Sequence, residues 1–473
     1  MRRISGLLAA SFFLILAPDA ARAAALDGAG MGWPWALPFA AMLLSIAAGP
    51  TLAARLWSRH YGKVALAWSA LMLAALAAVY GAPVATAAFV HAMLAEYLSF
   101  IVLLFALYVT AGGILVTGNL RGTPLVNTAL LAIGTLLASL IGTTGAAMVL
   151  IRPLIAANAG RRHRMHVIVF FIILVANIGG ALSPLGDPPL FVGFLRGVDF
   201  FWPARNLWPQ TAILALPILA LFAATDTWLQ RGEHQAVQSG PLSLRIRGAV
   251  NFALIALIIA AILGSAMWKP GIAFTVYGTP LALENIARDL VLVAIAFASL
   301  WLTPAEHRAA NGFTWEPIRE VAKLFAGIFV TIIPVLAMLQ AGRSGAFAWL
   351  LRIVTDPDGT PHEVAYFWLA GSLSAFLDNA PTYLVFFELT GGDAAKLMGP
   401  ISGTLAAISL GAVYMGALTY IGNAPNFMVK AIAEENGIRM PSFFAYMLWA
   451  ALILLPLFAL LTWLPVAPVL RSS

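Results

Sequence analysis

Two aspartates lie within long apolar segments of this chain, each beside residues that interrupt a helix. Asp187 stands in the run SPLGDPP (183–189) and Asp378 in the run FLDNAPT (376–382). A carboxylate at membrane depth is costly, so it indicates an ion or proton path. Asp-Pro also suits a helix N-terminus, so the alternative for Asp187 is a cap on its own half-helix. For Asp378, the neighbouring Asn379 could be the cap, which would leave the carboxylate free to bind an ion.

Four such interruptions occur, in two pairs with matching spacing. The first pair is IGTTGA (141–146) with SPLGDPP, and the second is FLDNAPT with TYIGNAPN (419–426). Thr143 and Asp187 are 44 residues apart, and Asp378 and Asn423 are 45 residues apart. Backbone groups freed by proline and glycine must be satisfied by protein, water or ligand at this depth. Paired breaks in two halves predict the binding site of a secondary transporter.

The breaks supply neutral oxygens beside the two carboxylates, a set of ligands that suits a hard cation such as Na⁺. The alternative for each hydroxyl is a bond to its own helix. The breaks hold no Lys or Arg, so their charge favours cations over anions. The predicted ion- and substrate-binding residues are Thr143, Thr144, Gly145, Ser183, Gly186, Asp187, Asp378, Asn379, Thr419, Gly422, Asn423 and Asn426, with Asp187 and Asp378 as the Na⁺ ligands.

The composition indicates the class of protein. Of the 473 residues, 61% are apolar and 10% are charged, and the mean hydropathy is +0.90. Soluble domains carry about 25% charged residues, so a soluble enzyme, a disordered protein and a coiled coil are excluded. The chain has no Cys, which removes disulfides and thiolate metal sites. The net charge of +7 is interpreted as basic cytoplasmic loops beside a lipid bilayer, not as nucleic-acid binding.

The predicted fold is an all-α polytopic membrane protein with about ten transmembrane helices. Two re-entrant hairpins and two broken helices are expected to form an inverted-topology repeat. This topology places the RRHR cluster (161–164) inside, as the positive-inside rule requires. The seven His residues are expected in loops or at span ends, where they are solvated. The first repeat covers 36–229, with hairpin 124–158 and broken helix 167–197, and the second covers 249–465, with hairpin 363–391 and broken helix 398–435.

Residues 1–23 have the pattern of a cleaved secretory signal peptide. Arg2 and Arg3 precede an apolar run from Gly6 to Ala17, and ARA (21–23) fits a small-x-small cleavage site. The alternative is a short first membrane helix. A cleaved signal would place the protein in the bacterial inner membrane with its mature N-terminus in the periplasm.

The runs NIGGALSPLGDPPLFVGFL (177–195) and SAFLDNAPTYLVF (374–386) resemble the ion transporter superfamily. The nearest likeness is to NhaD-type sodium/proton antiporters and the citrate transporters grouped beside them. The resemblance implies a scaffold domain, a transport domain that moves as an elevator, a homodimer, and no cofactor besides transported Na⁺ and H⁺. The hairpin tips lack the Ser-Asn-Thr motif of the dicarboxylate carriers, which argues against dicarboxylate binding. By residue, Thr143 and Thr144 match the first hairpin tip, Asp187 the first broken helix, Asp378 and Asn379 the second tip, and Asn423 the second broken helix.

Three functions compete at this point. The first is a Na⁺/H⁺ antiporter in which Na⁺ and a proton compete for Asp187 and Asp378. The second is a cation-coupled carrier of citrate or another carboxylate held by half-helix N-termini, with arsenite-type oxyanion export as a variant. The third is an intramembrane aspartyl protease, which the order of the motifs and Leu185 disfavour. We therefore expect a transporter of a small ion or carboxylate, not an enzyme.

Overall fold

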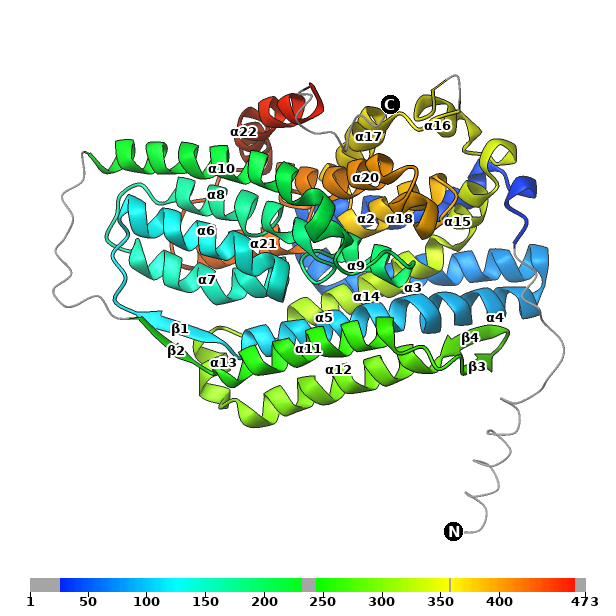
Figure 1. Cartoon of the computed structure of the whole chain (residues 1–473), viewed down its shortest axis with the longest axis horizontal. Helices are drawn as coiled ribbons and strands as arrows, with labels where there is room; N and C mark the ends of the chain where they lie inside the picture. Colours follow the sequence, from blue (N-terminus) through cyan, green and yellow to red (C-terminus); the bar gives the residue numbers. More distant parts are fainter. Residues whose placement is uncertain (1–25, 232–243, 357–358, 464–473) are drawn as a thin grey trace, which may run out of the picture. The chain divides into compact units, whose positions relative to one another are not determined.

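The computed structural model describes residues 26–231, 244–356 and 359–463, and helices dominate it (Figure 1). The predicted signal peptide, 1–23, lies outside the described residues. Two short antiparallel strand pairs complete the described secondary structure, and in the first pair Leu115 faces Arg247. The strands are β1 (Leu115–Gly118) with β2 (Leu244–Arg247), and β3 (Ala273–Val276) with β4 (Thr279–Ala282).

The helices of the described residues confirm the predicted class. Nine of them are long and apolar enough to cross a membrane, and a tenth span results if α14 (Glu316–Thr331) and α15 (Ile333–Gln340) are counted together. These two helices meet at an angle of 44°, where Pro334 follows Ile333 at the start of α15 and disfavours a straight continuation. The all-α polytopic membrane fold with about ten spans is therefore confirmed.

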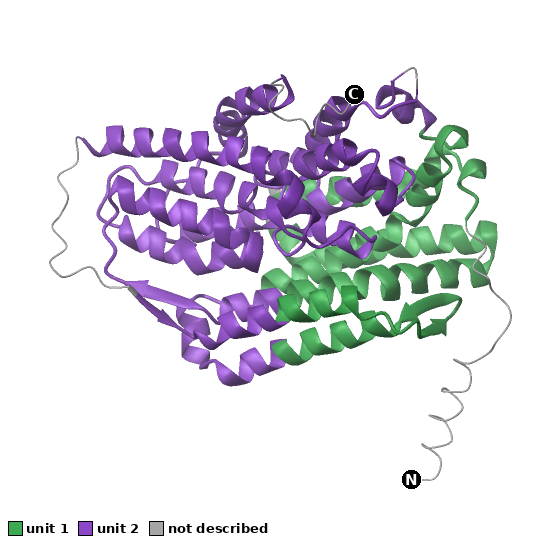
Figure 2. Ribbon diagram, viewed as in Figure 1, with its two compact units in different colours: residues 1–105, 258–295, 315–347 green, residues 106–257, 296–314, 348–473 purple. Residues whose placement is uncertain are grey.

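The chain forms two compact units, which Figure 2 shows in separate colours. The first unit comprises the described residues of 1–105, 258–295 and 315–347. The second comprises those of 106–257, 296–314 and 348–473. Helices α5 (Leu98–Gly112) and α12 (Leu283–Leu302) contribute residues to both units.

The first unit is built from long apolar helices packed through aromatic side chains. Phe100 stacks on Phe325 with ring centroids 4.7 Å apart, which joins α5 to α14. Helix α4 continues into α5 through a π-helical turn, so the three pieces form one span, Ala82–Gly112. The remaining elements of this unit are η2 (Gly28–Gly30), η3 (Trp33–Ala36), α2 (Leu37–Leu52), α3 (Ala54–Tyr80), α4 (Ala82–His91), η4 (Ala92–Tyr97), η6 (Gly342–Ser344) and the adjoining part of α11 (Val250–Met267).

The second unit contains the interrupted segments. Helix α8 (Met165–Leu174) and helix α20 (Ser402–Met415) are mostly apolar and buried, as expected for helices at the centre of a bundle. Around them pack α6 (Pro124–Ile141), α7 (Thr143–Ala157), η5 (Ile178–Leu182), α9 (Pro188–Leu195), α10 (Trp202–Gln230), α13 (Ala305–Ala310), α16 (Ala348–Ile353), α17 (Glu363–Phe376), α18 (Asn379–Leu389), α19 (Ala394–Met398), η7 (Gly416–Leu418), α21 (Ala424–Glu435) and α22 (Phe443–Trp463).

Both halves of the second unit show the same order of interruptions. A helix pair, α6–α7 or α17–α18, precedes a helix that gives way to a 3₁₀ turn, η5 or η7, and then to a short helix, α9 or α21. Pro188 and Pro425 stand in the first turn of these short helices, where the missing N–H is harmless. The four breaks at the centre of the unit hold the predicted site residues.

Candidate transport site

The first hairpin turns at a glycine in the left-handed region. Gly142 has φ +81°, a conformation that L-residues with a Cβ rarely adopt, and it separates α6 from α7. The N–H of Thr143 then donates to the carbonyl oxygen of Gly186 at 2.8 Å. This bond holds the tip of the first hairpin against the break of the first broken helix.

The second hairpin turns through an extended residue pair, Leu377 and Asp378. The Asp378 carboxylate accepts the backbone N–H of Ala380 at 3.2 Å, so Asp378 caps α18. The suggestion that Asn379 is the cap and Asp378 is free was therefore wrong. Asn379 is the first residue of α18, and its side chain is free to bond elsewhere.

A hydroxyl organises each broken helix in the same way. Ser183 donates to the carbonyl of Ser139 and accepts the backbone N–H groups of Leu185 and Gly186 at 3.1 and 3.2 Å. Thr419 donates to the carbonyl of Ala375 at 2.5 Å and accepts the N–H groups at positions 421 and 422 at 3.3 and 3.1 Å. Each hydroxyl thus satisfies backbone groups that the break would leave unpaired at membrane depth.

In each broken helix, two backbone segments pass in close contact at a pair of glycines. A Cβ on Gly186 would lie 2.2 Å from the carbonyl oxygen of Gly180. A Cβ on Gly422 would lie 2.6 Å from the carbonyl oxygen of Gly416. Both contacts are far closer than a carbon atom tolerates, so the path of the backbone requires glycine at both positions.

The Asp187 carboxylate is where the four breaks converge. Its side chain is buried, at 1% exposure. Thr143 Oγ1 donates to Oδ1 at 3.1 Å, Asn423 Nδ2 donates to Oδ1 at 2.9 Å, and Asn379 Nδ2 donates to Oδ2 at 2.5 Å. The three donors come from the first hairpin tip, the second broken helix and the second hairpin tip. Asp187 forms no side-chain cap bond to α9, so the alternative of capping alone was wrong.

Corresponding residues of the two halves are related by one constant offset along the chain. Asp187 and Asn423 are 236 residues apart, and so are Thr143 and Asn379, and Ser183 and Thr419. This register makes Asn379, not Asp378, the counterpart of Thr143. Counted from Asn379 to Asn423, the spacing in the second half is 44 residues, the same as from Thr143 to Asp187. The same register pairs the carboxylate of the first half with an amide in the second half.

The charge at this centre has no cationic partner among its bonded groups. The hydroxyl and the two amides that reach Asp187 are all neutral, and a buried carboxylate is stable only with strong compensation. Asn379 Oδ1 is also buried and accepts no hydrogen bond. Across the described residues, no cluster of three His, Asp or Glu side chains offers a conventional metal site. The site is therefore one buried carboxylate held by neutral hydrogen-bond donors.

The other predicted residues have different positions. Thr144 is half-buried and takes no part in the bonds to Asp187. Gly145 is a packing glycine, since a Cβ there would lie 2.9 Å from the Cβ of Ala111. Asn426 donates to the carbonyls of Gly416 and Thr419, both at 2.9 Å, and so braces the second break.

Sequence reasoning did not assign a role to Asn177, which the structure brings to the site. Asn177 Nδ2 donates to Asn426 Oδ1 at 2.7 Å and to the carbonyl of Ile172 at 2.8 Å. It also lies next to Ala176, whose carbonyl accepts the second bond of Asn423 at 3.0 Å. The sequence offers one signal for this role, which is an amide side chain within a long apolar run.

A second buried polar cluster contradicts the expected placement of the His residues. His166 is 3% exposed, and its Nε2 lies 2.8 Å from Asp226 Oδ1. Arg161 lies 2.6 Å from the same oxygen, and Asn127 donates to Asp226 Oδ2 at 2.9 Å. Asn158 bonds both Asn127 and Arg161. The cluster ties the open end of the first hairpin to α8 and α10, so His166 is a core residue and not a solvated one.

Comparison with known proteins places these features in a family. A family model described as "Putative citrate transport" matches residues 28–466. An uncharacterized transporter of Mycobacterium bovis is 24% identical over 332 residues, covering 67% of this chain and 71% of the relative. An uncharacterized transporter of Mycobacterium tuberculosis gives the same values. The matched region includes all four breaks and Asp187, and the chain belongs to this family of membrane transporters.

Proposed function

We propose that the protein is a secondary active transporter that exchanges Na⁺ for H⁺ at Asp187. The observation that carries this proposal is the buried carboxylate with three neutral donors, one from each of the other breaks. A cation or a proton neutralises such a carboxylate, and both cannot occupy it together. Competition for one site couples the two fluxes.

The side chains around Asp187 suit both occupants. Rotation of the Asn379 and Asn423 amides exchanges a donor N–H for an acceptor oxygen. With Na⁺ bound, these oxygens, the Thr143 hydroxyl and the carboxylate would form a set of hard oxygen ligands. The buried Asn379 Oδ1, which accepts no hydrogen bond, supports this rearrangement. With a proton bound on Oδ2, the Asn379 amide turned in the same way would accept it through Oδ1.

Asp378 takes a supporting role in this proposal. Its carboxylate caps α18, and the adjacent Asn379 is the residue that reaches Asp187. Asp378 therefore fixes the tip from which Asn379 extends. Asp187 is the principal ligand for Na⁺. Asp378, the other predicted Na⁺ ligand, has a secondary role.

The test is a pH-dye assay in everted vesicles from cells without their own antiporters. Respiration acidifies the vesicles, and added Na⁺ or Li⁺ should restore dye fluorescence. Asp187→Asn should abolish the recovery. Asp199→Asn is the matched control, because Asp199 forms an exposed ion pair with Arg205. Recovery of equal size in Asp187→Asn would reject exchange at this site.

Cation-coupled carriage of citrate is the second candidate, and the family description favours it. In that case, the cation at Asp187 would offset the charge of a carboxylate bound at the half-helix N-termini. Labelled citrate uptake into right-side-out vesicles, without dye recovery on Na⁺ in everted ones, would select this function. The protease alternative has less support, because Asp187 and Asp378 bond separate partners instead of each other.

The transport cycle belongs to the same proposal. We infer an inverted repeat, an elevator-type movement, a homodimer, and residence in a bacterial inner membrane with a periplasmic mature N-terminus. The RRHR cluster (161–164) supports the topology through the positive-inside rule. A reporter fused after Arg164 should be cytoplasmic, and a periplasmic signal would overturn the inverted repeat.

A further inference from the structure

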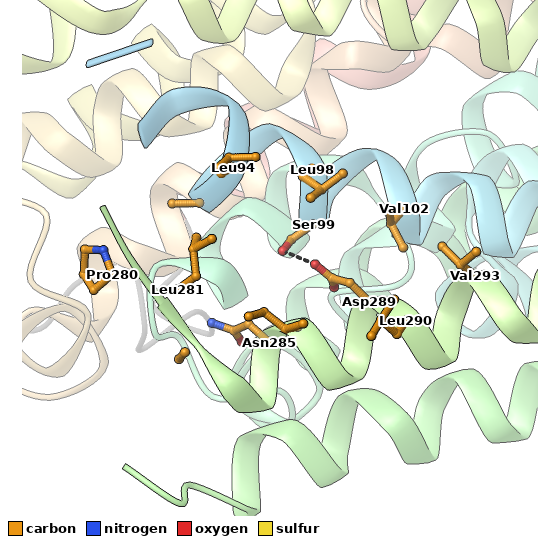
Figure 3. A pocket seen from close by; sticks show the side chains of 13 residues that line it. Leu94, Leu98, Ser99, Val102, Pro280, Leu281, Asn285, Asp289, Leu290 and Val293 are labelled. Atoms are coloured by element: carbon orange, nitrogen blue, oxygen red, sulfur yellow. Dashed lines mark hydrogen bonds between the residues drawn. The ribbon is translucent and has the colours of Figure 1, made fainter. Parts of the chain in front are cut away.

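A cavity of about 230 Å³ lies within the first unit (Figure 3). Its walls come from η4, α5, β4 and α12. Most of the lining is aliphatic and includes Leu94, Leu98, Leu281 and Val293. Figure 3 shows these side chains around the space between the blue helix, α5, and the green helix, α12. The lining contains no Lys or Arg.

A small polar cluster forms one side of the cavity. Ser99 donates to Asp289 at 2.6 Å, which Figure 3 marks with a dashed line. Behind it, the buried Arg288 donates to Asp289 at 2.9 Å, to Ser99 at 2.9 Å and to Asn285 Oδ1 at 3.1 Å. The pair of opposite charges makes the cluster neutral. Asn285 lines the cavity and is exposed, and its Nδ2 donor is not used by any bond within the cluster.

The backbone beside the cavity departs from a regular α-helix. Leu94 and Ala95 belong to η4, a π-helical turn within the span Ala82–Gly112. Such turns are rare within α-helices and are frequent at functional sites. The opposite wall, α12, is itself a candidate span, Leu283–Leu302. The cavity is therefore bounded by two candidate membrane spans.

The neighbouring β3–β4 hairpin locates the cavity near the end of these spans. Phe274 and Tyr277 on this hairpin are more than half exposed, at 54% and 56%. Trp268, at the end of α11, is 52% exposed. Exposed aromatic side chains of this kind mark the membrane–water interface. An apolar cavity with one polar side at that level suits a molecule with an apolar tail and a polar head.

The unused donor on Asn285 distinguishes a lipid from a partner helix. A membrane-spanning helix satisfies its backbone groups internally and presents apolar side chains to such a lining, so it offers no acceptor for Asn285 Nδ2. A phospholipid carries ester oxygens at the point where its acyl chains begin. We propose that the cavity binds one acyl chain of a bilayer phospholipid, with the ester oxygens of that lipid accepting from Asn285 Nδ2. Because the cluster is neutral and the lining has no cation, the lipid is zwitterionic.

Native mass spectrometry of the full chain tests this proposal directly. Delipidated protein is incubated with equal amounts of phosphatidylethanolamine and phosphatidylglycerol. One phosphatidylethanolamine should remain bound, and Ala95→Phe, which fills the cavity, should lower its occupancy at least tenfold. Ala294→Phe is the matched control, because Ala294 is exposed on α12 and does not line the cavity.

A second variant keeps the test decisive if Ala95→Phe fails to fold. Val293→Phe fills the same cavity from α12 and should give the same loss. Unchanged occupancy in a folded cavity variant, or preferential retention of phosphatidylglycerol, would overturn the proposal. A shift of the wild type to a dimer mass on lipid removal, without any bound lipid, would instead identify a protein contact and also overturn it. None of these outcomes depends on ion exchange at Asp187.

Discussion

Asp187 and Asn423 occupy corresponding positions in the two halves of the chain, 236 residues apart, and hydrogen-bond each other at 2.9 Å. Each residue directly precedes the short helix that follows its break, α9 or α21. The two halves therefore meet at equivalent residues, of which one is an acid and the other is its amide. These two equivalent positions thus carry one charge between them. That asymmetry gives the proposed site a capacity of one proton or one monovalent cation.

The first prediction exchanges these two residues. Asp187→Asn alone should abolish exchange, since no carboxylate remains among the bonded groups. The double variant Asp187→Asn with Asn423→Asp restores one acid next to one amide, and we expect it to recover at least a tenth of the wild-type dye response. The same vesicle assay measures both variants. An inactive double variant with normal expression and melting temperature would show that the surroundings of position 187 cannot be replaced by those of position 423.

The second prediction concerns the glycine crossing at the first break. Gly186→Ala places a Cβ 2.2 Å from the Gly180 carbonyl oxygen. Neither backbone segment can move away without breaking the Ser183 bonds, so we expect a loss of about 1–3 kcal/mol in the free energy of unfolding. Thermal unfolding in detergent measures this change.

The matched control for Gly186→Ala is Gly264→Ala. Gly264 lies in α11, and a Cβ there meets nothing within 4 Å. Replacing an exposed helical glycine by alanine should raise stability by about 0.5–1 kcal/mol. Opposite signs for the two variants are expected. Equal melting temperatures would mean that the break around Gly186 relaxes freely.

The sequence predicted the four breaks because helix interruption is a local property. Proline, glycine and a capping side chain lie within a few residues of each break, so the motif alone located Asp187, Asn379 and Asn423. The match of spacing between the halves also depended only on counting along the chain. The polytopic fold followed from hydropathy in the same way.

The roles of the two aspartates could not be predicted in this way. Asp187 and Asp378 both precede a half-helix, and either could cap it. The roles of the two aspartates differ because Asn379, 192 residues away along the chain, donates a hydrogen bond to Asp187. His166 was misplaced for a related reason, because its partner Asp226 lies on α10. A lone acid inside the apolar α10 is the signal in the sequence that indicates a buried cluster.

The third prediction tests the hydroxyl that organises the second break. Thr419→Val keeps the shape of the side chain but removes the acceptor for the N–H groups at positions 421 and 422. Buried donors without partners cost about 1–3 kcal/mol, and exchange should fall with the loss of order at Asn423. Thr419→Ser should retain both properties.

Thr128→Val serves as the control for Thr419→Val. Thr128 donates only to the Pro124 carbonyl on its own helix, at 2.7 Å. Valine at this position loses only that side-chain bond. The melting temperature should change very little, because the backbone hydrogen bonds of the helix remain intact. A similar loss in both variants would show that the effect comes from valine in a helix bundle and not from the break.

The last prediction concerns the buried cluster at the open end of the first hairpin. Asp226→Asn removes the charge that faces Arg161 at 2.6 Å, and Arg161 is only 4% exposed in its side chain. A buried cation left without its partner costs about 3–5 kcal/mol, whereas the exposed pair of Asp199 and Arg205 contributes about 0–1 kcal/mol. We therefore expect Asp226→Asn to melt well below Asp199→Asn. The double variant Arg161→Met with Asp226→Leu should recover much of the loss, because it removes both charges together. If Asp226→Asn and Asp199→Asn melted at the same temperature, the cluster would not clamp the hairpin to α8 and α10.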